Sequence, residues 1–192
     1  DSSDRRRFEA TLDYNRNSDT DKGDRREVYV APHPFITDYS YDNRRTSAGL
    51  NADYSASWGE ASSLNLGTTL RGVSDRVEKF SYRPVPVFRH REWNGYVYAS
   101  FSSRLGRLYY MASAGLEAIR LTAGDETNAY LKPRISTSGT LNLGAGHSTR
   151  LSYTLTNRAP SVGQLNPYNT STDPLVVTRG NPSLLPEQWH SL

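Results

Sequence analysis

Residues with distinctive backbone chemistry concentrate in the last third of the chain, between Arg158 and Glu187. Pro160 has no N–H to donate to a sheet ladder, so we expect a strand to end close to it. The Gly-Asn-Pro run at 180–182 suits a tight turn, because Gly and Asn accept a left-handed backbone and Pro fixes the next dihedral. We predict a long loop here, followed by a strand that starts at Pro186. Its candidate loop or ligand residues are Arg158, Pro160, Asn166, Pro167, Gly180, Asn181, Pro182, Pro186 and Glu187.

A weak calcium candidate lies near the N-terminus, where oxygen-bearing side chains alternate along the chain. The residues are Asn17, Asp19, Asp21 and Asp24, with Gly23 among them. An EF-type calcium loop requires Gly at its sixth position and Glu at its twelfth, but Lys22 and Val28 occupy those positions. We therefore interpret this stretch as a solvated acidic turn and predict no metal site.

No set of residues suited to catalysis occurs in the sequence. There is no nucleophile on a sharp turn with a base and an acid to match, and no glycine loop that cradles phosphate. The chain has no Cys, and its four His residues are too scattered to form a ligand motif. We predict that the protein is not an enzyme and uses no cofactor. With 23 basic and 20 acidic residues, a net charge of +3 gives no basic face for nucleic acid.

Alternation of polar and apolar residues is the dominant pattern, and it predicts strands that are polar on one face and apolar on the other. In one segment, for example, Leu50, Ala52 and Tyr54 alternate with Asn51, Asp53 and Ser55. The segment at 93–101 is less regular, because Tyr96 and Tyr98 fall on its polar side. The alternating segments lie at 8–15, 50–58, 63–71, 93–101, 107–117, 135–143 and 150–156.

The connections between these segments favour a membrane barrel over a soluble sandwich. Long connections are expected at 15–45, 77–91, 123–129 and 159–188, and they alternate with short turns near Gly59, Gly106 and Gly146. Membrane barrels have short periplasmic turns and longer outward loops, whereas soluble meanders do not keep this parity. The mean hydropathy of −0.71 also suits strands that are apolar only at alternate positions. The sequence contains no run of about twenty apolar residues, so it predicts no membrane helix.

The sequence resembles the barrel of TonB-dependent outer-membrane receptors, in particular the Bacteroidetes-type outer-membrane β-barrel family. The resemblance rests on the ordered loop motifs R-x-P-S, Q-L-N-P and G-N-P-x-L-x-P-E between Arg158 and Glu187. Further matches are the hairpins at 51–67 and 96–116, although Glu117 stands where the family pattern has Arg. The implied fold is all-β, an antiparallel up-and-down transmembrane barrel segment of about seven to eight strands. Residues 1–192 would be a partial barrel domain, with the N-terminal plug and the remaining strands outside this chain.

What the resemblance implies about function is the binding and import of a scarce solute across the bacterial outer membrane. The solute would be an iron chelate, a vitamin, a glycan or a peptide. The energy would come from the inner membrane, through TonB and the plug. Other implied partners are outer-membrane lipid, lipopolysaccharide and a surface lipoprotein, but no nucleic acid. The basic clusters at 5–7, 25–26 and 44–45 either meet lipopolysaccharide phosphates or are simply solvated.

Two other functions stay open at the level of the sequence. One is an outer-membrane adhesin or scaffold barrel without transport, and the other is a soluble carbohydrate-binding β-sandwich. The residues of the 159–188 loop likewise have two interpretations. Either they contact ligand at the outward mouth, or they only fold the loop and fix the barrel register. By strand alternation, Arg158 continues the polar row of Arg150 and should point into the lumen.

Overall fold

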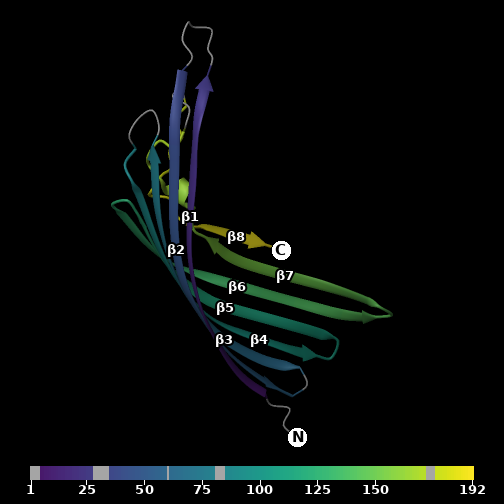
Figure 1. Cartoon of the computed structure of the whole chain (residues 1–192). Helices are drawn as coiled ribbons and strands as arrows, with labels where there is room; N and C mark the ends of the chain where they lie inside the picture. The colour runs from purple at the N-terminus through teal and green to yellow at the C-terminus, as the bar shows by residue number, and fades with distance from the viewer. Residues whose placement is uncertain (1–4, 28–34, 60, 81–84, 172–175) are drawn as a thin grey trace.

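Eight strands form one antiparallel sheet in the computed structural model, which describes residues 5–27, 35–59, 61–80, 85–171 and 176–192. Side chains are described for these residues except 24–27, 35–39 and 80. The strands pair in chain order, with β1 and β8 at the two edges of the described sheet (Figure 1). Their bounds are β1 Arg5–Glu27, β2 Phe35–Trp58, β3 Ser62–Phe80, β4 Phe88–Leu105, β5 Leu108–Ala123, β6 Glu126–Gly144, β7 His147–Arg158 and β8 Glu187–Ser191.

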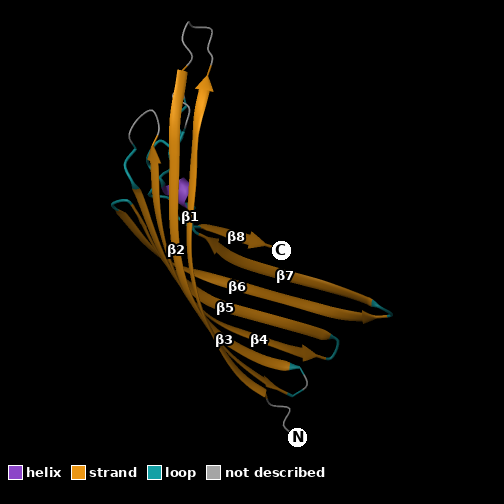
Figure 2. Ribbon diagram, viewed as in Figure 1, coloured by secondary structure: helices purple, strands orange, loops and turns teal. Residues whose placement is uncertain are grey.

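The sheet is strongly twisted, and β1 and β2 reach farther than the other strands at one end (Figure 1). The strand ends that flank residues 28–34, 81–87, 124–125 and 159–186 all lie at this end, called the loop end below. The opposite turn end holds short turns such as the one at Gly106, whose φ of 58° favours glycine. Figure 2 shows how little of the chain is helical: α1, Val162–Leu165, is the single helix of the described residues.

Three of the expected long loops are wrong, because the strands continue well beyond the alternating segments. In the stretch expected as a loop at 15–45, β1 and β2 stay paired from Asn15↔Ser47 to Glu27↔Phe35. In the stretch expected as a loop at 77–91, β3 continues to Phe80 and β4 begins at Phe88, with 81–84 outside the described residues. The loop expected at 123–129 becomes a turn at 124–125. Ladder hydrogen bonds still satisfy the backbone there, while both faces of a strand are free to be polar once it leaves the bilayer. Loss of alternation therefore marked the exit from an apolar environment and not the end of a strand. The loop at 159–186 is confirmed.

The two faces of the sheet differ sharply in composition. One face, called the inner face, packs against the 159–186 loop, and on β5 it carries the buried Glu117, Ile119 and Leu121. The opposite, outer face carries large apolar side chains that stay exposed, among them Leu12 at 80% and Leu131 at 65%. Cross-strand pairing aligns the outer side chains into rows, for example Leu12, Leu50, Leu70, Gly95, Ala118 and Leu131. No second sheet covers these rows in the described part of the chain.

Aromatic residues border the apolar rows of the outer face. Near the turn end, Trp58, Phe101 and Tyr110 lie on three strands with neighbouring ring centroids 6.0 Å apart. Toward the loop end, Trp93 stands on the same outer row of β4 as Phe101 and is 65% exposed. The stretch from Trp93 to Phe101 is about as long as the ~9–11 residues that a tilted strand needs to cross a bilayer. An apolar band between two aromatic girdles is the outer surface expected of a membrane barrel.

Candidate functional site

The 159–186 loop begins with a fully formed capping box around α1. Ser161 Oγ accepts a hydrogen bond from the backbone N–H of Gln164, and the Gln164 side chain accepts one from the Ser161 N–H at 2.8 Å. This reciprocal pair satisfies donors that a helix start leaves open. A helix of one turn has little stability of its own, so the cap and the packing below it must fix its place.

The returning arm of the loop closes the other end of α1. The N–H of Gly180 donates to the carbonyl of Asn166 at 2.7 Å, and the N–H of Asn181 donates to the carbonyl of Gln164 at 2.7 Å. A Cβ at Gly180 would lie 2.3 Å from that Gln164 oxygen, so only glycine permits this approach. Asn166 and Asn181 also accept N–H bonds from the residues two positions ahead, Tyr168 and Ser183. Pro160 and Pro186 are buried where the loop leaves and rejoins the sheet.

The folded loop packs onto the inner face at the loop end instead of projecting away from the sheet. Leu165 is 1% exposed and joins Val77, Phe88 and Ala123 in one apolar cluster. Burying a side chain of this size contributes about 1.5–3 kcal/mol. The Phe88 and Tyr168 rings meet edge-on with centroids 6.4 Å apart.

Polar contacts bind the loop along the sheet on both sides of this cluster. Asn128 Nδ2 donates to the carbonyl of Pro182 at 3.3 Å, and Ser183 Oγ donates to Glu126 Oε2 at 2.8 Å. On the other side, Lys79 Nζ donates to the carbonyl of Thr170. Lys79 lies beyond the apolar rows, outside the lipid, and burial under the loop lowers the pKa of its ammonium group.

Below the loop, a histidine and an aspartate form a buried pair on the inner face. His90 Nδ1 lies 3.1 Å from Asp75 Oδ2, and both side chains are 2% exposed. Arg45 approaches the other carboxylate oxygen of Asp75 at 3.9 Å. His90 Nε2 is buried and has no hydrogen-bond partner among the described residues. The pair lies two positions along β3 and β4 from Val77 and Phe88, which pack against the loop.

A second polar cluster on the inner face centres on Glu117, which is 5% exposed. Asn94 Nδ2 donates to one carboxylate oxygen at 2.7 Å, and Asn157 Nδ2 donates to the other at 3.1 Å. Arg134 lies 3.8 Å from the same carboxylate. Asn157 also donates to the carbonyl of Pro133, next to the point where the β6–β7 ladder stops. These donors compensate the cost of burying the carboxylate.

Stacked tyrosines continue this polar surface toward the turn end. Tyr98 crosses the adjacent Gly67 and donates to Asp53 Oδ1 on β2 at 2.6 Å. Tyr96 stacks on Tyr98 with centroids 5.4 Å apart, and the Arg134 guanidinium lies 4.5 Å above the Tyr96 ring. The inner face therefore offers flat aromatic surfaces beside hydrogen-bonding groups. Such a lining suits reversible contacts with polar solutes.

The residues singled out from the sequence divide into two groups in the structure. Arg158 and Glu187 are exposed and stand opposite each other in the β7–β8 register. With Pro160 they line a hollow of about 230 Å³. The other signature residues fold the loop: Asn166, Pro167, Gly180, Asn181, Pro182 and Pro186 lie along its two arms. At the end of β7, Asn157 and not Arg158 reaches Glu117, because the β6–β7 ladder ends at Ile135 and Leu155 and alternation no longer holds. A ligand role for these residues stays a prediction.

The calcium candidate does not form a loop. Asn17, Asp19 and Asp21 lie along β1, where side chains at alternate positions cannot converge on one ion, and the Asp24 side chain lies outside the described residues. Among the described residues, no group of three or more His, Cys, Asp or Glu is placed to hold a metal.

Comparison with known proteins settles the family. The model of the outer membrane protein beta-barrel family matches residues 2–192. The chain belongs to this family. An outer-membrane barrel places the protein in the bacterial outer membrane, with the outer face of the sheet against lipid and the inner face toward the lumen. No curated protein matches the chain. In the described residues, no helix has the length and apolar character needed to span a membrane.

Sequence reasoning missed the functional candidates of this outer-membrane wall that depend on pairing between strands. In the sequence, Glu117 was notable only as a departure from the family pattern, and nothing indicated the Asp75–His90 pair. The signal for both was strand parity: Asp75, His90 and Glu117 all occupy inner positions toward the loop end. Combining parity with strand register would have brought them together.

Proposed function

We propose that this chain is the barrel wall of an outer-membrane receptor that binds a scarce solute at its outer face and imports it. The main support is the 159–186 loop, which lies against the lumen face and buries Leu165 there. A loop in this position narrows the outer mouth of a barrel. The polar and aromatic inner surface beneath it suits passage of a solute that is released from the mouth.

The import mechanism follows from the resemblance of the loop motifs to those of TonB-dependent receptors. On this proposal, the rest of the barrel and a plug close the lumen, and TonB supplies energy through the plug. Strands β1 and β8 are the edges of the described sheet, and pairing with further strands would protect them. The chain itself contributes wall, loop and lumen surface without catalysis. A surface lipoprotein that delivers the solute would dock at the loop end.

A second candidate is a non-transporting adhesin or scaffold barrel. The feature that favours it is the β1–β2 hairpin, which extends beyond the other strands at the loop end (Figure 1). A projecting hairpin offers surface for binding without any need for a pathway through the lumen.

Deletion of the gene that encodes the parent protein separates the two candidates. Wild-type and deletion strains would be grown with iron chelates, cobalamin, glycans or peptides as the limiting nutrient, with uptake of labelled solute measured. The receptor proposal expects loss of uptake of one solute class, and equal loss when an uncoupler collapses the inner-membrane proton gradient. Unchanged uptake of all four classes, together with reduced surface attachment, would support the adhesin instead.

A further inference from the structure

Three arginines stand directly opposite one another on the outer, lipid-facing side of the sheet. Arg44 of β2 pairs with Arg76 of β3, and Arg76 pairs with Arg89 of β4. Arg76 and Arg89 are outer residues, because their inner-facing neighbours Asp75, Val77, Phe88 and His90 are buried. Arg44 lies on the same face through its pairing with Arg76. Like charges placed directly across strands destabilise a sheet. The row therefore has an electrostatic cost that an anion bound outside it would remove.

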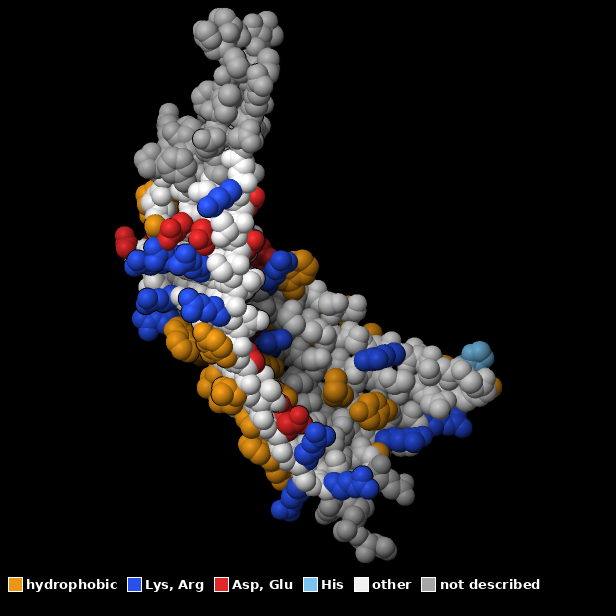
Figure 3. Space-filling model, viewed as in Figure 1, with side chains coloured by type: hydrophobic (Ala, Val, Ile, Leu, Met, Phe, Trp, Pro, Cys, Tyr) orange, Lys and Arg blue, Asp and Glu red, His pale blue; other side chains and the backbone are white. Residues whose placement is uncertain are grey.

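Further arginines extend this row toward the apolar band. Arg16 and Arg91 fall on the next cross-strand row, linked through Thr46 and Ser74, and Arg120 pairs with Trp93 on the row after that. Figure 3 shows Lys and Arg side chains gathered in a band beside the hydrophobic band. The arginine belt is defined here as Arg16, Arg44, Arg76, Arg89, Arg91 and Arg120, all of them exposed.

Carboxylates offset only part of this charge. Arg44 Nη2 lies 3.3 Å from Asp42 Oδ2, and Arg76 is paired with Glu78. Both carboxylates lie on the side of the belt away from the apolar band. Arg89, Arg91 and Arg120 have no ion-pair partner within the part of the chain that the structure describes. On this outer surface the belt thus keeps an excess of positive charge at the edge of the lipid.

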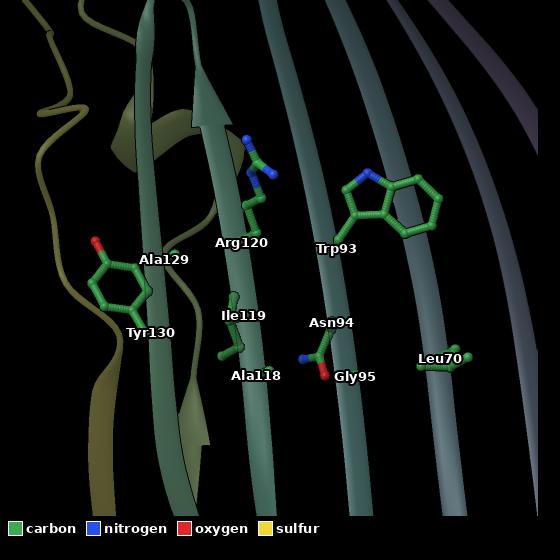
Figure 4. A pocket seen from close by; sticks show the side chains of 9 residues that line it. All are labelled: Leu70, Trp93, Asn94, Gly95, Ala118, Ile119, Arg120, Ala129 and Tyr130. Atoms are coloured by element: carbon green, nitrogen blue, oxygen red, sulfur yellow. The ribbon is translucent and has the colours of Figure 1, made fainter.

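An apolar hollow of about 340 Å³ lies beside the belt, on the membrane side (Figure 4). Leu70 and Trp93 border it, and the small residues Gly95, Ala118 and Ala129 form its floor, with Arg120 at the end nearest the belt. A Cβ at Gly95 would lie 3.3 Å from Leu70 Cδ2, so the glycine keeps this space open. The hollow has the chemistry of an acyl-chain site.

We propose that the arginine belt binds the phosphate groups of the outer-leaflet glycolipid, lipopolysaccharide, with one acyl chain in the adjoining hollow. Guanidinium groups hold phosphate through paired, charge-assisted hydrogen bonds. The belt lies directly beyond the apolar band, at the depth of lipid head groups, and the hollow lies within the band. An acidic protein partner would match the charge but not the apolar hollow. The inference rests on the outer-membrane location and is independent of solute import.

The test uses the full-length parent protein in phosphatidylcholine vesicles, with and without bisphosphorylated lipid A. The belt variant is Arg76→Gln/Arg89→Gln. The matched control, Arg107→Gln/Arg150→Gln, removes the same charge near the turn end. Lipid A retained through detergent washing is quantified, with dephosphorylated lipid A and added inorganic phosphate as further arms. We expect the belt variant to bind lipid A about tenfold or more weakly, as loss of charge-assisted bonds implies, and the control to bind normally.

A stability measurement separates lipid binding from a folding defect. Without lipid A, removing opposed charges should raise the urea midpoint of the belt variant above wild type; with lipid A, the order should reverse. Arg76→Lys/Arg89→Lys keeps the charge but loses the paired geometry, and should bind with intermediate affinity. If the Gln variant does not fold, lipid A binding is compared between the Lys variant and wild type instead. Equal binding by wild type and variants, equal binding of dephosphorylated lipid A, or displacement by millimolar inorganic phosphate would each overturn the proposal.

Discussion

Gly67 shows how one small residue organises the lumen face. It lies between Asp53 and Tyr98 on the same cross-strand row, and the Tyr98 ring passes over it to reach the carboxylate. A Cβ at Gly67 would lie 2.3 Å from both Tyr98 Cε1 and Asp53 Oδ1. The hydrogen bond from Tyr98 therefore depends on the absence of a side chain on the strand between.

We predict that Gly67→Ala lowers the free energy of unfolding by about 1–3 kcal/mol, because the added methyl overpacks against Tyr98. Gly139→Ala is the control: it too is within a strand, but its Cβ would meet only Leu108 Cδ1, at 3.7 Å. That change should be neutral or slightly stabilising, since it reduces the freedom of the unfolded chain. Urea unfolding of the protein in vesicles measures both effects. Equal effects of the two substitutions would contradict the role given to Gly67.

Replacing Glu117 tests whether its buried carboxylate holds the inner cluster together. Glu117→Leu leaves the amides of Asn94 and Asn157 without the carboxylate acceptor, so we expect a loss of about 1–3 kcal/mol in stability. Glu117→Gln keeps one acceptor and should cost less than the Leu variant. Asp125→Asn, in the exposed turn after β5, is the control and should change stability by less than about 0.5 kcal/mol. A fully stable Glu117→Leu variant would show that this cluster contributes nothing to the fold.

Among the elements, the 159–186 loop is held by contacts between residues that lie far apart in the sequence. Its two arms meet where the amides of Gly180 and Asn181 reach the end of α1. The Asn-Pro-Gly chemistry of the sequence predicted the loop, but the left-handed backbone expected at Gly180 and Asn181 does not occur, and Gly180 is needed for its close approach to Gln164 instead. The sequence did not predict the packing of Leu165 on Val77 and Phe88, because no local pattern specifies which surface a loop will cover.

Two glycines in this loop provide a matched pair of substitutions. Gly180→Ala places a methyl against the backbone of Gln164, which cannot move without breaking the closure of α1, so the loop should detach from the wall. Gly163→Ala, inside α1, meets nothing within 4 Å and should leave the loop in place. Hydrogen exchange at the amides of 180 and 181 measures the difference. We expect protection to fall at least about tenfold in the first variant only, equivalent to about 1.4 kcal/mol of local stability. Unchanged protection in Gly180→Ala would contradict the observed closure.

The strand boundaries show that polar–apolar alternation in the sequence reflects contact with lipid and not the extent of each strand. Alternation located the segments that face lipid, such as 50–58, because lipid tolerates few polar side chains. It failed at 15–27, where β1 continues with polar residues on both faces.

The arginine belt was missed for a related reason. Its members lie on five different strands, and only the register between strands brings them together. The doublet at 44–45 divides between the two faces, with Arg44 in the belt and Arg45 near Asp75.

At the scale of the whole molecule, the sheet separates lipid from lumen, and neighbouring residues should respond oppositely to charge. Ile135 lies on the outer face near the middle of the apolar band, and Ser136 lies beside it on the inner face. Ile135→Arg should cost about 2–4 kcal/mol, as expected for Arg near the bilayer midplane. Ser136→Arg should cost less than about 1 kcal/mol, because its side chain faces water. Urea unfolding in vesicles compares the two. A larger loss for Ser136→Arg would reverse the assignment of faces.

Solvent accessibility along β6 tests the two-faced wall most directly. Single cysteines at successive positions from 128 to 138 of the protein, in a cysteine-free background, would carry nitroxide labels in lipid vesicles. Collision rates with oxygen, which concentrates in lipid, and with a water-soluble nickel chelate would be measured at each site. The structure predicts strict alternation, with odd positions such as Leu131 and Ile135 favouring oxygen and even positions such as Lys132 and Arg134 favouring nickel. Collision rates without a two-residue period, or with the two sets exchanged, would contradict a wall between lipid and lumen.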